Sequence, residues 1–323
     1  MLLAYIMAFL PANRDASLDA KFNPKLRSQT MHNWIRWIII LQLFIVYTYA
    51  SVAKLYADWL DFSMIEVLMS SKKDYYVIGD LLQERWGHKI IAIFGICFDL
   101  LIVPALLWKP TRKIAFVLSI FFHLFNSIVF QIGIFPYLSL AFTVFFFEPQ
   151  TIRNIFLKTK KIIPETKIII PKTKNVVLTV LGIYFLFQLI LPLRHHFFKD
   201  DVLWTEEGHR LSWRMMLRSR GGRITYKVVN SQTKDTTKIN LNDYLTKKQQ
   251  RRVACYPDFI WQFAQRLKKE YAEQGEEIQV FVENKVKINQ NPYQQFIDPN
   301  VDLANVPWKH FAHNDWILPS PKE

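Results

Sequence analysis

The sequence predicts an α-helical multipass membrane domain followed by a soluble, strand-rich α+β domain. Three observations support this prediction. Five apolar runs lie before residue 195 of the 323 residues. The remainder is polar and combines helical spacing with strand-like alternation. The mean hydropathy of +0.06 lies between the values typical of a soluble enzyme and of a bare membrane bundle.

The apolar runs define a membrane domain over residues 1–194. They cover residues 34–53, 89–108, 114–130, 134–147 and 175–193. A helix needs about 20 residues to cross a bilayer, with a range of about 17–25. The fourth run is short and is expected to be a tilted or buried helix. Residues 1–10 are too short to span alone and resemble the end of a helix, so about five spans are expected, with N-terminal spans missing.

Basic residues gather in three segments between or before these runs: the arm before residue 34, the loop 109–113 and the segment 148–174. By the positive-inside rule, these segments face the cytosol. Counting helices then places the mixed-to-acidic loop 54–88 and residues 195–323 on the other side. We expect an integral protein of the ER membrane or bacterial inner membrane, with a lumenal or periplasmic C-terminal domain.

The net charge of +14 does not indicate nucleic-acid binding. Basic residues lie beside apolar runs, which fits a lipid bilayer with anionic headgroups as the partner. The basic run 158–174 lacks the interleaved aromatic residues of a nucleic-acid platform, and it is expected to be a solvated loop. Cys97 and Cys255 do not form a disulfide framework. The chain has no Walker A, HExxH, paired CxxC or GxSxG motif, and no metal site is expected.

The C-terminal domain, residues 195–323, shows both helical and strand patterns. Leu211–Leu217 and Arg223–Val229 read as strands on either side of Gly221–Gly222, which predicts a hairpin turn. Residues 243–273 are predicted to be helical, and Ile278–Ile288 alternates as a strand does.

Lys54 stands where the first apolar run ends, after residues 37–53 that carry no charge. Desolvation penalises a charged amine, so a lysine in this position is a candidate catalytic base. Two structural interpretations stand beside this one. The side chain extends to the headgroups as an anchor, or it pairs with Asp58 one turn on, which would keep it protonated.

Polar residues also occur within the apolar runs. Four in the third run share one helical face, because their spacing follows the helical period. They are Ser119, His123, Asn126 and Ser127. Such a face either joins helices by hydrogen bonds or lines a substrate cavity. Asp99, in the second run, is expected to have a partner, with His123 and Lys54 as candidates.

Short motifs recur along the chain in a fixed order. They are Phe44–Tyr47, Ala50–Trp59, Phe98–Leu100, His123–Ser127, Ile132–Tyr137, Leu191–Pro192, Trp204–Thr205, Ser212–Met216 and Phe296–Asp302. In this order they resemble the vitamin K-dependent γ-glutamyl carboxylase family, which joins an HTTM-type membrane domain to a lumenal domain. The resemblance runs from about residue 4 to the end. No single motif identifies the family, but the complete set in this order is specific to it.

The resemblance implies an enzyme that converts peptide glutamate to γ-carboxyglutamate with reduced vitamin K, O2 and CO2. It gives Lys54 the role of the base that deprotonates the vitamin K hydroquinone. The candidates for binding the quinol are Asp99, His123, Asn126 and Ser127. The family's glutamate-binding stretch corresponds to Trp204–Trp213. The peptide-binding candidates there are Trp204, Thr205, His209, Arg210 and Trp213.

The chain departs from the family pattern in three respects. Members usually have more helices and a histidine-bearing motif upstream of the segment matching residues 1–10, so we expect a longer chain or a partner that supplies those helices. The glutamate-binding stretch carries charged or titratable residues where better-known members are mostly neutral: Glu206, Glu207, His209 and Arg210. Among these, Arg210 is a candidate clamp for a carboxylate. The cysteine pair that joins the two domains in animal members has no counterpart.

Two other functions stay open from the sequence. The first is a quinol-binding oxidoreductase that forms the epoxide without carboxylating peptides, which the missing upstream motif motivates. The second is a non-catalytic membrane protein whose outer domain binds a Glu-containing peptide.

Overall fold

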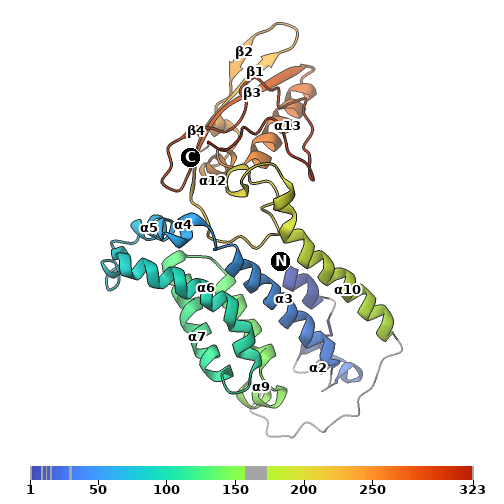
Figure 1. The fold of residues 1–323 in the computed structure, drawn as a ribbon. Coiled ribbons are helices and arrows are strands. Elements are labelled where there is room, and N and C mark those ends of the chain that lie inside the picture. Colours follow the sequence, from blue (N-terminus) through green and yellow to red (C-terminus); the bar gives the residue numbers. More distant parts are fainter. Residues whose placement is uncertain are drawn as a thin grey trace. The chain divides into compact units, whose positions relative to one another are not determined.

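The computed structural model of the protein describes residues 2–8, 10–11, 13–14, 17–28, 31–156 and 173–321 (Figure 1). These residues fall into two compact units. The first unit is Met1–Val52 with Ile93–Leu189, and the second is Ala53–Ala92 with Ile190–Glu323. Of the basic run 158–174, predicted to be a solvated loop, positions 158–172 lie outside the described residues.

The first unit is helical. Its elements are α1 (Leu2–Ala8), α2 (Leu18–Phe22), η1 (Pro24–Leu26), α3 (Asn33–Val52), the greater part of α6 (Arg85–Leu107), α7 (Arg112–Phe125), η3 (Asn126–Phe130), α8 (Phe135–Phe142), η4 (Thr143–Phe146), α9 (Pro149–Phe156) and α10 (Lys174–Ile190). Among the described residues, four helical stretches are long and apolar enough to cross a membrane. They are Asn33–Val52, Arg85–Leu107, Arg112–Phe130 and Lys174–Phe197. The fourth predicted run forms the shorter helix Phe135–Phe146, and the predicted helical class is confirmed.

Apolar side chains from α3, α6, α7, α8 and η4 make the core of the first unit. Phe98 of α6 stacks on Phe122 of α7, with ring centroids 3.7 Å apart. Ser51 Oγ of α3 donates to the carbonyl of Ile96 in α6 at 2.9 Å. These runs form helices because, in hydrocarbon, only helices and closed barrels satisfy their backbone hydrogen bonds internally.

The second unit contains, within the part of the chain that the structure describes, a four-stranded antiparallel sheet in the order β2–β1–β3–β4 (Figure 1). The strands are β1 (Arg220–Asn230), β2 (Thr236–Lys238), β3 (Ile278–Ile288) and β4 (Gln294–Gln295). β1 and β3 pair along their whole length, with Arg220 opposite Ile288 and Asn230 opposite Ile278. Alternate residues of β3 are buried, so the predicted strand is confirmed.

The second unit also contains helices, most of them short. They are α4 (Ala57–Leu60), α5 (Ser63–Ser70), η2 (Leu81–Gln83), η5 (Leu191–Phe197), α11 (Val202–Thr205), η6 (Leu241–Asp243), α12 (Lys247–Val253) and α13 (Pro257–Glu273). Ile260, Ala264 and Leu267 of α13 pack into the core beneath the sheet. The prediction that residues 243–273 are helical is confirmed for most of the segment, which forms two helices. Pro257, which has no N–H, begins a new helix, so the segment divides into α12 and α13.

The predicted hairpin at Gly221–Gly222 is wrong. Both glycines lie inside β1, and Leu211–Leu217 is not a strand. A Cβ on Gly222 would lie 1.9 Å from the carbonyl oxygen of Ala254. This glycine therefore permits a close backbone approach within a strand rather than a turn.

The segment Ala53–Ala92 belongs to the second unit, together with the C-terminal residues. Met64, Ile65 and Met69 of α5 are buried, and Trp59 Nε1 donates to the carbonyl of Ala92 at 3.2 Å. The sequence indicates only a connecting loop here, because neither the length nor the polarity of the segment reveals its packing partners. The domain boundary predicted at residue 194 stays a prediction.

Candidate functional site

Lys54 lies two residues beyond the last residue of α3, Val52. Only 8% of Lys54 is exposed. Its Nζ lies 5.5 Å from the centroid of the Trp59 ring, and Trp59 is itself buried. The amine therefore lies beside an aromatic ring, where few water molecules reach it.

Asp58, the residue on which the charge of Lys54 was expected to depend, has a partner in the C-terminal part of the unit. Its Oδ2 accepts a hydrogen bond from Asn289 Nδ2 at 2.5 Å. Asn289 is held in turn by Ser219: Asn289 N donates to the carbonyl of Ser219 and Ser219 N donates to Asn289 Oδ1, both at 2.9 Å. The turn that carries Lys54 is thus bound to the ends of β1 and β3.

Tyr56 makes a second link between this turn and the C-terminal residues. Its hydroxyl donates to the carbonyl of Leu217. Burial, and then the charge of Asp58, raise the pKa of the Tyr56 phenol well above its ordinary value. The phenol therefore keeps its proton and stays a donor at neutral pH.

The second unit also contains a pocket of about 450 Å³. This volume lies in the range of small-molecule and side-chain binding sites. Arginine and aromatic side chains contribute much of its wall. They include Arg194, Arg210, Arg218, Arg252, Tyr256 and Trp261. These residues come from segments far apart in the sequence, so the pocket is a product of the fold of the unit.

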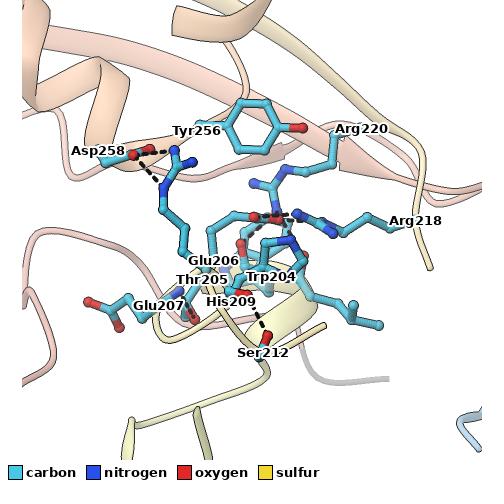
Figure 2. A network of polar contacts seen from close by, with 12 residues as sticks. Trp204, Thr205, Glu206, Glu207, His209, Ser212, Arg218, Arg220, Tyr256 and Asp258 are labelled. Atoms are coloured by element: carbon cyan, nitrogen blue, oxygen red, sulfur yellow. Dashed lines mark hydrogen bonds and ion pairs between the residues drawn. The ribbon is translucent and has the colours of Figure 1, made fainter. Parts of the chain in front are cut away.

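A buried ion-pair cluster supports one wall of the pocket (Figure 2). The Glu206 carboxylate receives a forked pair of hydrogen bonds from Arg218 and a third bond from Arg220 Nη1, at 3.2 Å. The three side chains are 6%, 9% and 2% exposed, respectively. Arg220 Nη1 also donates to the carbonyls of Leu203 and Trp204, at 2.7 and 2.8 Å. Burial lowers the pKa of the Arg220 guanidinium below its usual range.

Two of the five predicted peptide-binding residues, His209 and Arg210, line the pocket. Trp204 and Thr205 are buried elsewhere in the packing of the unit: Trp204 Nε1 donates to the carbonyl of Leu318 at 2.7 Å, and Thr205 Oγ1 to that of Asp201 at 3.1 Å. Trp213 is partly buried, and its Nε1 has no hydrogen-bond partner among the described residues.

His209 is uncharged in the folded protein. Burial, followed by the charges of Arg218, Arg214 and Arg210, lowers its pKa to about 3. Its Nδ1 is buried without a hydrogen-bond partner among the described residues. A neutral imidazole in an arginine-rich wall leaves a polar nitrogen available to a ligand, and it avoids a further positive charge.

This shift predicts a pH dependence of stability. The pKa of His209 is about 3 in the folded chain and 6.5 ordinarily. The unfolded chain therefore binds more protons between these values, so the His209 contribution is complete above pH 6.5 and falls as the pH falls. We expect the loss of unfolding free energy between pH 7 and pH 5 to be smaller in His209→Gln. Denaturant unfolding at both pH values measures this loss. In the control variant His310→Gln, which replaces an exposed histidine, the loss between the two pH values should equal that of the parent.

Gly208 explains how the loop after α11 closes over this wall. Its φ is +70°, and a Cβ there would lie 2.7 Å from the Cα of His195. Only glycine satisfies both constraints without strain. The sequence does not single out Gly208, Arg194, Arg252 or Asp258 as site residues, because their positions in the pocket depend on contacts between distant segments.

The predicted quinol-binding residues lie in the first unit. Asp99 and His123 are buried there, as is Asn126. His123 Nε2 is 2.9 Å from the Tyr47 hydroxyl, and its Nδ1 is buried without a partner among the described residues. Ser127 is half-buried and donates to the hydroxyl of Tyr137 at 2.8 Å.

The surroundings of His123 are aromatic. The rings of Phe98, Phe122 and Phe135 lie edge-on to its imidazole, with centroids 5.3–6.3 Å away. Asn126 and Ser127 begin η3, a π-helical continuation of α7. Such π-helical turns occur frequently at functional sites.

The two parts of the chain match two known domain families. Residues 1–150 match the HTTM domain. Residues 173–323 match the lumenal domain of vitamin K-dependent gamma-carboxylase. No solved structure matches the chain. The family resemblance seen in the ordered motifs is confirmed, and the chain belongs to the family that joins an HTTM domain to a vitamin K-dependent gamma-carboxylase lumenal domain.

Proposed function

We propose that this protein is a γ-glutamyl carboxylase, which converts peptide glutamate to γ-carboxyglutamate and couples this reaction to epoxidation of reduced vitamin K, with Lys54 as base. Family membership supports the class of reaction. The observation that carries the proposal is the position of Lys54: a buried lysine directly after a helix of membrane-spanning length, in the same compact unit as an arginine-rich pocket.

The residues of the first unit fit a quinol. A quinol is an aromatic ring with two hydroxyl groups, so it needs aromatic neighbours and polar atoms without other partners. Phe98 and Phe122 are the aromatic neighbours, and His123 Nδ1 is a buried polar atom without a partner among the described residues. We infer that these residues hold the quinol, together with Asp99 and Asn126. When bound, reduced vitamin K supplies, with O2, the strong base that activation of a peptide glutamate requires.

The protein's own groups would then act as follows. Lys54 accepts a proton at Nζ, and the Asp58–Asn289 hydrogen bond keeps its turn in place. His209 and Arg210 bind the carboxylate groups of the peptide in the pocket wall. Once the γ-proton of the glutamate has been removed, the γ-carbon forms its new bond to CO2.

The proposed function places the second unit on the lumenal or periplasmic side, where a Glu-containing peptide or protein would arrive. The matched domain is named lumenal, and the basic loops of the sequence favour the same orientation.

Incubation of membranes that contain the full chain with a Glu-rich peptide, reduced vitamin K and labelled bicarbonate tests the proposal. We expect the peptide to gain the mass and label of CO2 and vitamin K epoxide to form with it. Omission of the quinol should abolish both. Epoxide without labelled peptide would instead indicate an oxidoreductase, and peptide binding with neither product a non-catalytic binding protein.

A further inference from the structure

The Arg210–Asp258 pair at the pocket differs from the other ion pairs of its wall. Arg210 donates to Asp258 Oδ2 through both Nε, at 3.1 Å, and Nη2, at 2.5 Å. The two side chains are 61% and 22% exposed. Water screens a partly exposed ion pair, so another carboxylate can replace Asp258 at little cost. The buried Glu206–Arg218 pair is not exchangeable in this way, because separation would leave both charges in the interior.

Arg210 is positioned to make such an exchange without moving its backbone. Its carbonyl accepts a hydrogen bond from Arg194 Nη2 at 2.6 Å. Its guanidinium carbon lies 5.5 Å from the centroid of the Phe259 ring, which supports the side chain. Asp258 accepts both bonds through one oxygen, so a carboxylate that accepts them through two oxygens would form the stronger forked pair in its place.

The other carboxylates of the pocket wall are already engaged within the protein. Glu207 accepts hydrogen bonds from His313 Nδ1 at 2.6 Å and from the backbone N of Asn314 at 2.9 Å. Glu206 is held by the arginines described above. By contrast, Arg252, which also lines the pocket, has no carboxylate partner among the described residues. The wall therefore offers an acidic ligand more positive charge than its own carboxylates balance.

We propose that Arg210 is a specificity-determining residue that exchanges Asp258 for a second acidic side chain of the peptide. The pocket then prefers peptides in which another glutamate or aspartate lies near the glutamate to be modified. Asp258 competes with that side chain for Arg210. A peptide without a second acidic side chain therefore does not displace Asp258. This inference rests on the proposed function for its substrate, and the Arg210–Asp258 contact supplies the specificity.

Opposite effects of two substitutions test the exchange. The full chain in detergent micelles is titrated with fluorescent peptides that carry one glutamate and either a second glutamate or a glutamine nearby. We expect Asp258→Asn to tighten binding of the two-glutamate peptide about threefold, because the competitor is lost. Arg210→Gln should weaken it about tenfold and should weaken binding of the glutamine peptide less. Arg210→Lys, which keeps the charge without the fork, should give an affinity for the two-glutamate peptide between those of the parent and Arg210→Gln.

Arg266→Gln is the matched control, since Arg266 forms a comparable half-exposed pair with Glu270 on the same helix. Its affinities should equal those of the parent, and thermal unfolding shows that each variant is folded. Equal affinity of the parent for the two peptides, or no tightening in Asp258→Asn, would overturn the inference. Carboxylation of both peptides measured in parallel separates the two proposals: absence of carboxylation in the parent refutes the proposed function, whereas carboxylation without the charge preference refutes only the role of Arg210.

Discussion

Lys54→Ala is expected to lower the rate of peptide carboxylation by about 10²- to 10⁴-fold, which is the contribution of a positioned base. Lys54 is the buried amine against Trp59, and alanine leaves no group there to accept a proton. Lys54→Arg should be equally inactive, because a guanidinium stays protonated. Incorporation of labelled CO2 and formation of vitamin K epoxide are measured together, and both should be lost.

The control for Lys54 is Lys73→Ala, an exposed lysine in the same Ala53–Ala92 segment. It should retain parent activity. Peptide affinity should be unchanged in Lys54→Ala, since a base for the quinol does not bind the peptide. Carboxylation that persists in Lys54→Ala would exclude Lys54 as the base, and loss of peptide binding would indicate a structural role instead.

The second large effect concerns the folded state. Glu206→Gln is expected to lower the free energy of unfolding by about 3–5 kcal/mol, because it leaves two buried guanidinium groups without their shared counter-charge. Arg218 and Arg220 are only 9% and 2% exposed, so water cannot replace the carboxylate. Denaturant unfolding of the full chain in micelles, followed by tryptophan fluorescence, measures the loss.

A double substitution distinguishes an electrostatic cause from a packing cause. Glu206→Gln/Arg218→Met removes one uncompensated charge, so it should recover part of the stability lost in Glu206→Gln. Glu283→Gln, which removes an exposed pair with Lys227, should change stability little. A Glu206→Gln variant as stable as the parent would show that the two arginines do not depend on this carboxylate.

Local patterns were sufficient for much of the fold. Residues 278–288 alternate between apolar and polar types, and β3 has these bounds because a strand buries one side chain in two. The apolar runs predicted helices because a membrane leaves the backbone few alternatives. Turn signals were less reliable. Gly222 suggested a hairpin but permits a close contact with Ala254, and the break between α12 and α13 before Pro257 was not predicted.

The candidate site was predictable only in part. The motifs identified the family and the Trp204–Trp213 stretch, and His209 and Arg210 of that stretch do line the pocket. Asp258 and Arg252 lie on other segments, and a charged residue on a helix reads as a solvated surface position until its neighbours are known.

The sequence by itself determined the helical and α+β parts, the family and the candidate base at Lys54, because hydrophobic runs, alternation and ordered motifs are local. Only the tertiary structure decided that Ala53–Ala92 joins the C-terminal residues, that Asn289 binds Asp58, and that Arg210 meets Asp258 at the pocket. The physical reason is that the energy of a charge depends on its burial and on its nearest opposite charge, and both are set by segments distant in sequence.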